Sequence, residues 1–108
     1  MGLKHLKTKA EYVAAITEGK VVLDFSAQWC GPCKRIGPFF EELSAEFPNI
    51  LFCKVDVDDN PDAAEAESIS AMPTFKFFNN GVGVDALTLQ GASEKNLREN
   101  VVKLNEAA

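Results

Sequence analysis

Two cysteines that lie three positions apart, Cys30 and Cys33, are the residues of this sequence best suited to chemistry. Gly31 and Pro32 separate them, and Asp24 interrupts an apolar run six residues before the first cysteine. A cysteine pair at this spacing can contribute to a zinc site or can exchange between a dithiol and a disulfide. The sequence must therefore be searched for further metal ligands and for residues that tune a thiol.

A zinc site would need two more ligands, and the candidates are Cys53 and His5. Cys53 lies in an apolar run that we expect to be a buried strand, so these residues do not make a convincing set of four ligands. A purely stabilising disulfide is also disfavoured, because so short a loop restricts the unfolded chain little. We therefore predict a redox-active pair with no metal and no bound cofactor, the Cys30–Cys33 disulfide being the redox group.

The segments on either side of the pair predict how its two thiols differ. Residues 20–27 form a nearly continuous apolar run, typical of a buried strand, and apolar side chains at 36, 39, 40, 43 and 47 predict a helix after it. Cys30 would lie at the N-terminus of this helix, where free N–H groups stabilise a thiolate, and Pro32 suits the first turn. We expect Cys30 to attack a disulfide and Cys33, further in and more buried, to resolve the mixed disulfide.

Asp24 shares a strand face with Val22 and Ser26, and both faces of this strand should be covered. Burial should raise the pKa of its carboxyl, which could then act as a general base for the Cys33 thiol. Lys54, on the next predicted strand, could pair with it. A buried ion pair without a catalytic duty fits the same residues equally well.

Composition limits the class of protein. The 108 residues include 11 basic and 16 acidic side chains, a net charge of −5, which disfavours nucleic-acid binding. No apolar run approaches the roughly 20 residues that cross a membrane, and the first residues lack the apolar core of a signal peptide. We therefore expect a cytoplasmic protein with no nucleic-acid and no membrane partner. Structural disulfides are rare in that compartment.

Strand and helix patterns alternate along the chain and predict the order β-α-β-α-β-α-β-β-α. Local signals support it: Thr8 and Glu11 form a capping box, Pro38 should kink the second helix, and Ser93 caps the last one. The expected strands cover 3–6, 20–27, 49–57, 73–78 and 84–90. We predict one α/β domain over residues 1–108, with a mixed five-stranded sheet flanked by helices on both faces. Its centre is a parallel βαβ unit, and an antiparallel hairpin follows near the C-terminus.

Over nearly its whole length the sequence resembles the thioredoxin family. The stretch WCGPCK at 29–34 matches the active-site motif of that family, and DFSAQWCGPC places the family's buried aspartate at Asp24. KVDVDDNP places its partner lysine at Lys54, and Asp58 at a position that often contacts the active-site Trp29. MPTF carries the family's cis-proline at Pro73. The resemblance implies the thioredoxin fold.

The resemblance also implies a function and a docking surface. It implies a protein-disulfide reductase, most often monomeric, that acts in electron transport and cell redox homeostasis. An NADPH-dependent thioredoxin reductase would recycle it, and its substrates would be protein disulfides such as those of ribonucleotide reductase and peroxiredoxins. The implied docking residues are Trp29, Gly31, Pro32, Met72, Pro73, Gly91 and Ala92.

Three features depart from the family pattern. The hairpin is two residues longer, and we expect a longer tip or a bulge around 81–84; Gln28 lies at a variable position; and Cys53 is an extra thiol, expected in the core. Two other functions stay open. The first is a binding module in which thiol chemistry is incidental. The second is a disulfide oxidant or isomerase, which the Gly-Pro dipeptide disfavours.

Overall fold

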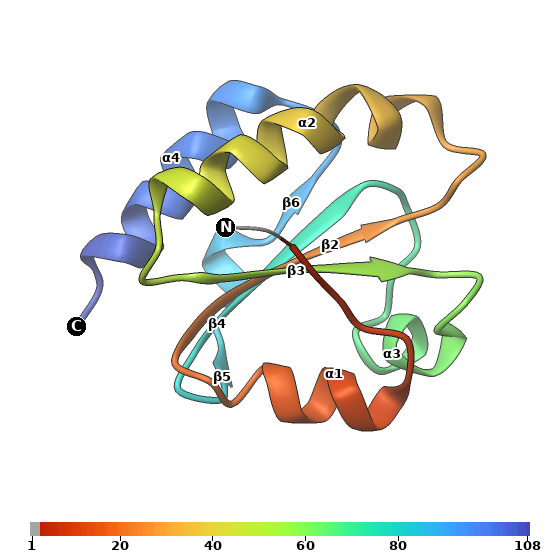
Figure 1. Cartoon of the computed structure of the whole chain (residues 1–108), viewed down its shortest axis with the longest axis horizontal. Helices are drawn as coiled ribbons and strands as arrows, with labels where there is room; N and C mark the ends of the chain where they lie inside the picture. The colour runs from red at the N-terminus through yellow and green to blue at the C-terminus, as the bar shows by residue number, and fades with distance from the viewer. Residues whose placement is uncertain (1–2) are drawn as a thin grey trace.

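The computed structural model describes residues 3–108, in which strands and helices alternate as the sequence predicts. The helices are α1 (Lys9–Ala15), α2 (Gly31–Glu46), α3 (Pro61–Ala66) and α4 (Glu94–Glu106). The strands are β1 (Lys4–His5), β2 (Lys20–Ser26), β3 (Leu51–Asp56), β4 (Thr74–Asn79), β5 (Val82–Gly83) and β6 (Leu89–Gln90), with a 3₁₀ turn, η1 (Asp85–Leu87). The sheet lies between two layers of helices, α2 with α4 on one side and α1 with α3 on the other (Figure 1).

The sheet has the strand order β1-β3-β2-β4, with β5 and β6 both paired to β4. β1, β3 and β2 are parallel, while β4 is antiparallel to β2 and to β5 and β6. Because β2 occupies one edge of β4, the two short strands share its other edge and fill one position in the sheet. The predicted mixed sheet is therefore confirmed, but it has six strands and not five, because two short strands take the place of the predicted fifth strand.

The strand predicted over 84–90 is wrong, because most of this segment is not paired. After β5 the chain leaves the sheet through η1 and returns only at β6. The side-chain amide of Asn100, in α4, donates a hydrogen bond of 2.8 Å to the carbonyl of Leu87 and holds the excursion against the helix. A tertiary contact has replaced the strand pairing that the alternation of side chains predicted.

The tip of the hairpin is tight. Asn80 and Gly81 both have positive φ, 55° and 85°, as a two-residue turn of the favoured type requires. The turn was predicted from Asn80-Gly81. Of the longer tip or bulge predicted around 81–84, the longer tip is wrong, because Asn79 already pairs with Val82. The irregular segment comes later, at η1.

The predicted helix signals at Thr8 and Ser93 are confirmed. The Thr8 hydroxyl accepts the Glu11 N–H at 3.1 Å and the Glu11 carboxylate accepts backbone N–H groups in return, while Ser93 caps α4. Pro38 lies inside α2, where its kink stays a prediction. No helix in the described part of the chain is long and apolar enough to cross a membrane.

Each face of the sheet has its own hydrophobic core. Beneath α2 and α4 lie Val22, Phe52, Phe75 and Phe77, whereas Val21, Leu23, Phe25, Cys53 and Val55 face α1 and α3. Because side chains alternate along a strand, Asp24 and Lys54 fall on the face beneath α2. The fold thus turns the carboxylate toward the helix that carries the two cysteines.

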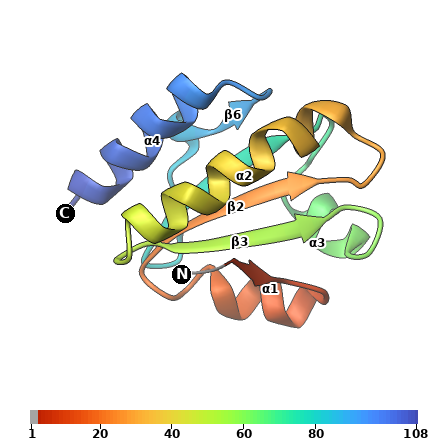
Figure 2. The same cartoon turned by 45° about the horizontal axis from the view of Figure 1, so that its top comes forward.

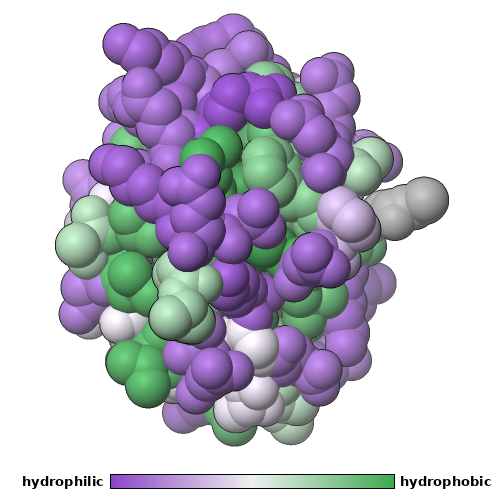
Figure 3. All heavy atoms as spheres, turned by 90° about the vertical axis from the view of Figure 1, so that its left-hand side faces the viewer, coloured by the Kyte–Doolittle hydropathy of each residue, from purple (hydrophilic) through white to green (hydrophobic). Residues whose placement is uncertain are grey.

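Both active cysteines lie where β2 ends and α2 begins. The turned view shows β2 and β3 running side by side toward this end of the molecule (Figure 2). At the other end, near the C-terminus, hydrophilic residues cover most of the surface and hydrophobic ones are scattered between them (Figure 3). The site is therefore built at the carboxyl ends of the parallel strands.

Candidate functional site

Cys30 and Cys33 form a disulfide at the N-terminus of α2, with their Cα atoms 5.3 Å apart. Cys30 is the N-cap residue, and the backbone N–H of Cys33 donates to its sulfur at 3.2 Å. Pro32 lies in the first turn, as expected. An N–H group and a helix N-terminus directed at one sulfur stabilise negative charge there, so Cys30 is the thiol best prepared to react as a thiolate.

Burial does not distinguish the two thiols. Cys30 is 5 % exposed and Cys33 is 4 % exposed, so the greater burial predicted for Cys33 is not seen in this disulfide form. Their surroundings do differ, because Cys33 lines a hollow of about 530 Å³ at the carboxyl ends of β2 and β3. Lys54 lines the same hollow, whereas Cys30 does not.

Asp24 is fully buried, and neither of its carboxyl oxygens has a hydrogen-bond partner. Burial raises the pKa of Asp24 to about 7, and the positive charge of Lys54 only partly offsets this effect. The carboxyl therefore changes its protonation state near neutral pH. That is the property that a general base for a thiol needs.

Lys54 lies directly opposite Asp24 in the register of β3 and β2. The ion pair that the sequence suggested between them is not made: in residues 3–108 an ion pair within 4 Å is found only between Arg98 and Glu46. Lys54 instead lines the hollow that Cys33 also lines. It acts on the carboxylate through its field and not through a contact.

The segment before β4 brings the predicted docking residues to the disulfide. The Met72–Pro73 peptide bond is cis, and Met72 packs against the cluster of Ala27, Cys30 and Cys33. The Gly91 N–H donates to the Pro73 carbonyl at 2.9 Å, which joins the two docking segments.

Gly91 is favoured by its backbone conformation, whereas Ala92 is held by packing. Gly91 has φ +99°, a conformation that favours glycine, although a Cβ there would meet no atom within 4 Å. Ala92 is half-buried and packs against the core beneath α4. Gly31 and Pro32 are exposed beside the disulfide. The structure therefore brings the predicted docking residues together, with Pro73 buried and Ala92 half-buried at their inner edge.

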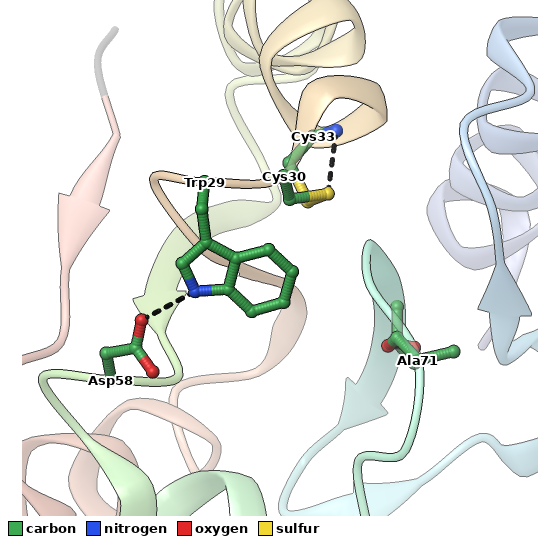
Figure 4. The surroundings of a disulfide bond; sticks show 6 residues. Trp29, Cys30, Cys33, Asp58 and Ala71 are labelled. Carbon is green, nitrogen blue, oxygen red and sulfur yellow. Dashed lines mark hydrogen bonds between the residues drawn. A yellow bond between two sulfur atoms is a disulfide. The ribbon is translucent and has the colours of Figure 1, made fainter.

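Trp29 is 67 % exposed and forms the outer wall of the site. Its indole N–H donates to a carboxylate oxygen of Asp58 at 2.9 Å (Figure 4). The Asp58 loop is itself ordered, because Asp56 accepts the N–H groups of Asp58 and Asp59 at 2.8 and 3.2 Å. The contact expected for Asp58 is present and holds the indole in one orientation.

Sequence reasoning missed Ala71 and Val57. Figure 4 shows Ala71 on the segment before β4, across from the disulfide, and the Thr74 hydroxyl donates to its carbonyl at 2.6 Å. Val57 packs against the cysteine cluster just after β3. Neither residue carries a chemical signal of its own. Only their positions beside Met72-Pro73 and at a strand end could have indicated them.

The third cysteine, Cys53, lies in the core between the sheet and α1, as predicted. It is fully buried, and burial raises the pKa of its thiol to about 12. Within residues 3–108, no group of three or more His, Cys, Asp or Glu side chains is placed to hold a metal ion. The chemistry that the site supports is exchange between a dithiol and a disulfide at Cys30 and Cys33.

Comparison with known proteins gives a consistent result. A family model described as Thioredoxin matches residues 4–103. A thioredoxin of Geodia cydonium is 50 % identical over 101 residues, which cover 91 % of this chain and 94 % of that protein.

Solved structures agree with this match. A Plasmodium falciparum thioredoxin structure is 44 % identical with a TM-score of 0.89, over 94 % of this chain and 98 % of that one. A structure from work on thiol resolution in a yeast mitochondrial 1-Cys peroxiredoxin through glutathione and thioredoxin systems is 32 % identical, with a TM-score of 0.88. That alignment covers 94 % of this chain and 95 % of the other.

Proposed function

We propose that this chain, which belongs to the thioredoxin family and is a protein dithiol–disulfide oxidoreductase, works as a reductant of disulfides in other proteins. The observation that carries the proposal is the placement of Cys30. Its sulfur lies at a helix N-terminus, accepts the Cys33 N–H, and lies beside an exposed indole and the Met72-Pro73 segment. A nucleophile and a docking surface for an extended chain are thus adjacent.

The first step is attack by the Cys30 thiolate on one sulfur of the substrate disulfide. The Cys30–substrate bond forms, the substrate S–S bond breaks, and the second substrate sulfur leaves as a thiolate that takes a proton. Trp29, Gly31, Pro32 and the backbone around Met72 hold the substrate segment. The surface is small, which suits brief encounters with many proteins.

The second step resolves the mixed disulfide. Asp24 takes the proton of the Cys33 thiol, and the Cys33 sulfur then attacks Cys30. The Cys30–Cys33 bond forms and the substrate leaves as a second thiolate, so that two electrons have passed from the dithiol to the substrate. A carboxyl whose pKa is about 7 can accept this proton in a neutral solution and release it again.

The electrons must be restored by a reductase. We infer an NADPH-dependent thioredoxin reductase as the recycling partner. Peroxiredoxins and ribonucleotide reductase are substrates to test first. The similar yeast structure, which comes from work on a peroxiredoxin, supports the first of these choices.

The test is the reduction of a protein disulfide by the reduced protein, with NADPH and a thioredoxin reductase. We expect Cys30→Ser to abolish turnover and Cys33→Ser to accumulate mixed disulfides with substrates. Cys53→Ala is the matched control, because it removes a thiol in the core on the opposite face of the sheet and should leave turnover unchanged. Normal turnover by Cys30→Ser would refute the proposal.

The direction of the reaction is tested by the reduction potential of the pair. A value near roughly −270 mV, the reference for thioredoxins, fits a reductant, whereas a value tens of millivolts higher would favour the alternative of an oxidant or isomerase.

We further infer a monomer that acts in the cytoplasm. A free buried thiol in a chain that also carries a redox-active pair suits a reducing compartment. Three large hydrophobic side chains are exposed among the described residues, namely Val13, Trp29 and Val82, and so few do not make a broad apolar interface. Cell fractionation and sedimentation measurements test the two inferences, and an exported protein or a stable dimer would refute them.

A further inference from the structure

Three polar side chains form a row across the parallel strands on the face beneath α2. The register pairs His5 of β1 with Lys54 of β3, and Lys54 in turn with Asp24 of β2. The Leu6 N–H donates to the Lys54 carbonyl at 2.9 Å and fixes this alignment. Because Leu6 packs into the opposite core, its neighbour His5 projects on the same face as Lys54 and Asp24.

The row passes from solvent to the interior. His5 is exposed, Lys54 is half-buried and Asp24 is fully buried. His5, Lys54 and Cys33 line the same hollow of about 530 Å³. The Lys54 ammonium makes no hydrogen bond and no ion pair with any of residues 3–108, so it is free to lie nearer to Asp24 or further from it.

Other charges face this hollow as well. The charged lining is completed by Lys7, two residues after the end of β1, Lys34 of α2, Asp56 of β3 and Asp59 of the following loop. The two carboxylates and these two ammonium groups balance in formal charge. Histidine is the residue type in the lining whose charge ordinarily changes between pH 5 and 8. His5 is the histidine of this lining, and it lies next to Lys54 in the row.

We propose that His5 is a positioning residue for the resolving step: through Lys54, its charge sets how readily Asp24 takes the proton of Cys33. A protonated His5 repels the Lys54 ammonium toward Asp24, and the approaching positive charge favours the carboxylate. A neutral His5 removes this repulsion, and Asp24 then holds its proton more tightly. The role of His5 rests on the proposed function, in which Asp24 is the base for Cys33.

Two substitutions at this exposed position separate charge from shape. His5→Gln keeps a polar side chain without a charge, and His5→Lys keeps a positive charge at every pH of interest. The titration midpoint of Asp24 is measured on the reduced protein from the NMR signal of its carboxyl carbon. The rate of the resolving step is measured over the same range, from pH 5 to pH 9.

We expect the Asp24 midpoint to be lowest in His5→Lys, intermediate in the unsubstituted protein and highest in His5→Gln. The two variants should differ by about half a pH unit, because two strand spacings are roughly 10 Å and salt at 0.1 M screens charges over a similar length. The midpoint of the resolving rate should move with it, and the difference should shrink in 1 M salt.

Lys7→Gln is the matched control. It removes one positive charge from the same hollow but lies outside the row, so its shift should be clearly smaller than that of His5→Gln. If the Asp24 midpoint shifts equally in the two variants, any positive charge lining the hollow would act on Asp24 to the same extent. That result would overturn the role of His5 through Lys54. Equal Asp24 midpoints in His5→Gln and His5→Lys would overturn it too. So would a shift of the Asp24 midpoint that leaves the pH dependence of the resolving rate unchanged.

Asp24→Asn distinguishes a failure of this inference from a failure of the proposed function. If this variant loses the pH dependence of the resolving rate while the His5 variants behave alike, the proposed base stands and the role of His5 is wrong. If Asp24→Asn keeps the full rate and its pH dependence, the proposed base fails, and the role of His5 fails with it.

Discussion

The two regions of this molecule that hold cysteine use the same side chain for opposite purposes. Cys30 and Cys33 lie at the start of α2, beside an exposed indole and a hollow that water can enter. Cys53 lies in the middle of β3, between the sheet and α1, with no accessible surface. One region makes a thiolate easy to form, and the other makes it costly.

Burial alone does not explain the difference, since Cys30 is itself only 5 % exposed. What Cys30 has, and Cys53 lacks, is a backbone N–H directed at its sulfur and the N-terminus of a helix behind it. For Cys53, burial is the largest influence and raises the pKa of the thiol to about 12. Reactivity in this protein therefore depends on which backbone groups surround the sulfur.

The largest expected effect is on alkylation of the reduced protein. A thiol whose pKa is about 12 contains about 1000-fold less thiolate at pH 7.5 than an ordinary cysteine. We therefore expect iodoacetamide to label Cys30 at least about 1000-fold faster than Cys53. Timed labelling followed by mass spectrometry of the peptides measures both rates.

Unfolding provides the control for this prediction. In denaturant the three thiols should react at similar rates, because burial and the helix are both lost. Rapid labelling of Cys53 in the folded protein would show that the core around β3 opens often, and the contrast between the two regions would then be wrong.

The next effect concerns Asp24 and the dependence of stability on pH. Its pKa in the folded protein, about 7, is higher than the ordinary value of 3.8, so the folded state binds this proton more tightly than the unfolded state. The contribution of this carboxyl to the free energy of unfolding is greatest below about pH 4. It falls as the pH rises toward 7 and is lost above that pH. The loss amounts to roughly 4 kcal/mol at pH 8.

Asp24→Asn removes that loss. The stability of the variant relative to the original should therefore rise by roughly 4 kcal/mol between pH 4 and pH 8, whatever constant cost the buried amide adds. Denaturant unfolding at the two pH values measures it. Asp59→Asn, at an exposed carboxylate, controls for the change in net charge. A difference that does not change with pH would show that Asp24 is ionised throughout.

Local patterns were sufficient for much of this site. The apolar run before Asp24 predicted a buried strand, and Pro32 with the spacing of apolar residues predicted that a helix begins at the cysteines. These features depend on residues close together in the chain. The capping residue, the buried carboxylate and the core position of Cys53 were therefore all predictable.

Other features depend on residues far apart in the chain. The alternation over 84–90 predicted a strand, but the bond from Asn100 to Leu87 holds that segment away from the sheet. The alignment of His5 with Lys54 is set by the register of β1 and β3, which no local pattern encodes. The direction of a long lysine side chain is not encoded either, and so the sequence left open an ion pair with Asp24 that is absent from residues 3–108 of the structure.

A smaller effect separates packing from reactivity at Cys53. Cys53→Ser places a hydroxyl in an apolar core without an obvious partner and should cost about 2 kcal/mol of stability, whereas Cys53→Ala should cost about 1 kcal/mol. Both variants should keep full turnover. Denaturant unfolding and disulfide reduction measure the two properties. Lost turnover in a stable Cys53→Ala protein would give the core thiol a part in the reaction.

The smallest expected effect concerns the orientation of the Trp29 indole, which forms part of the docking surface. Asp58→Ala removes the hydrogen bond that orients the Trp29 indole, at a position where stability should change by less than about 1 kcal/mol because the bond is exposed. A freely turning indole must be ordered again when substrate docks. We therefore expect KM to rise about 2- to 3-fold with kcat unchanged, as for an interaction that contributes equally before and during reaction.

Asp59→Ala is the control that decides the cause of this change. It removes the same charge from the next residue, whose carboxylate does not bond to Trp29. If orientation of the indole is what matters, KM should be nearly unchanged in this variant. An equal rise in both variants would mean that negative charge near Trp29 attracts substrates, and the outer wall of the site would then select partners by charge instead of by shape.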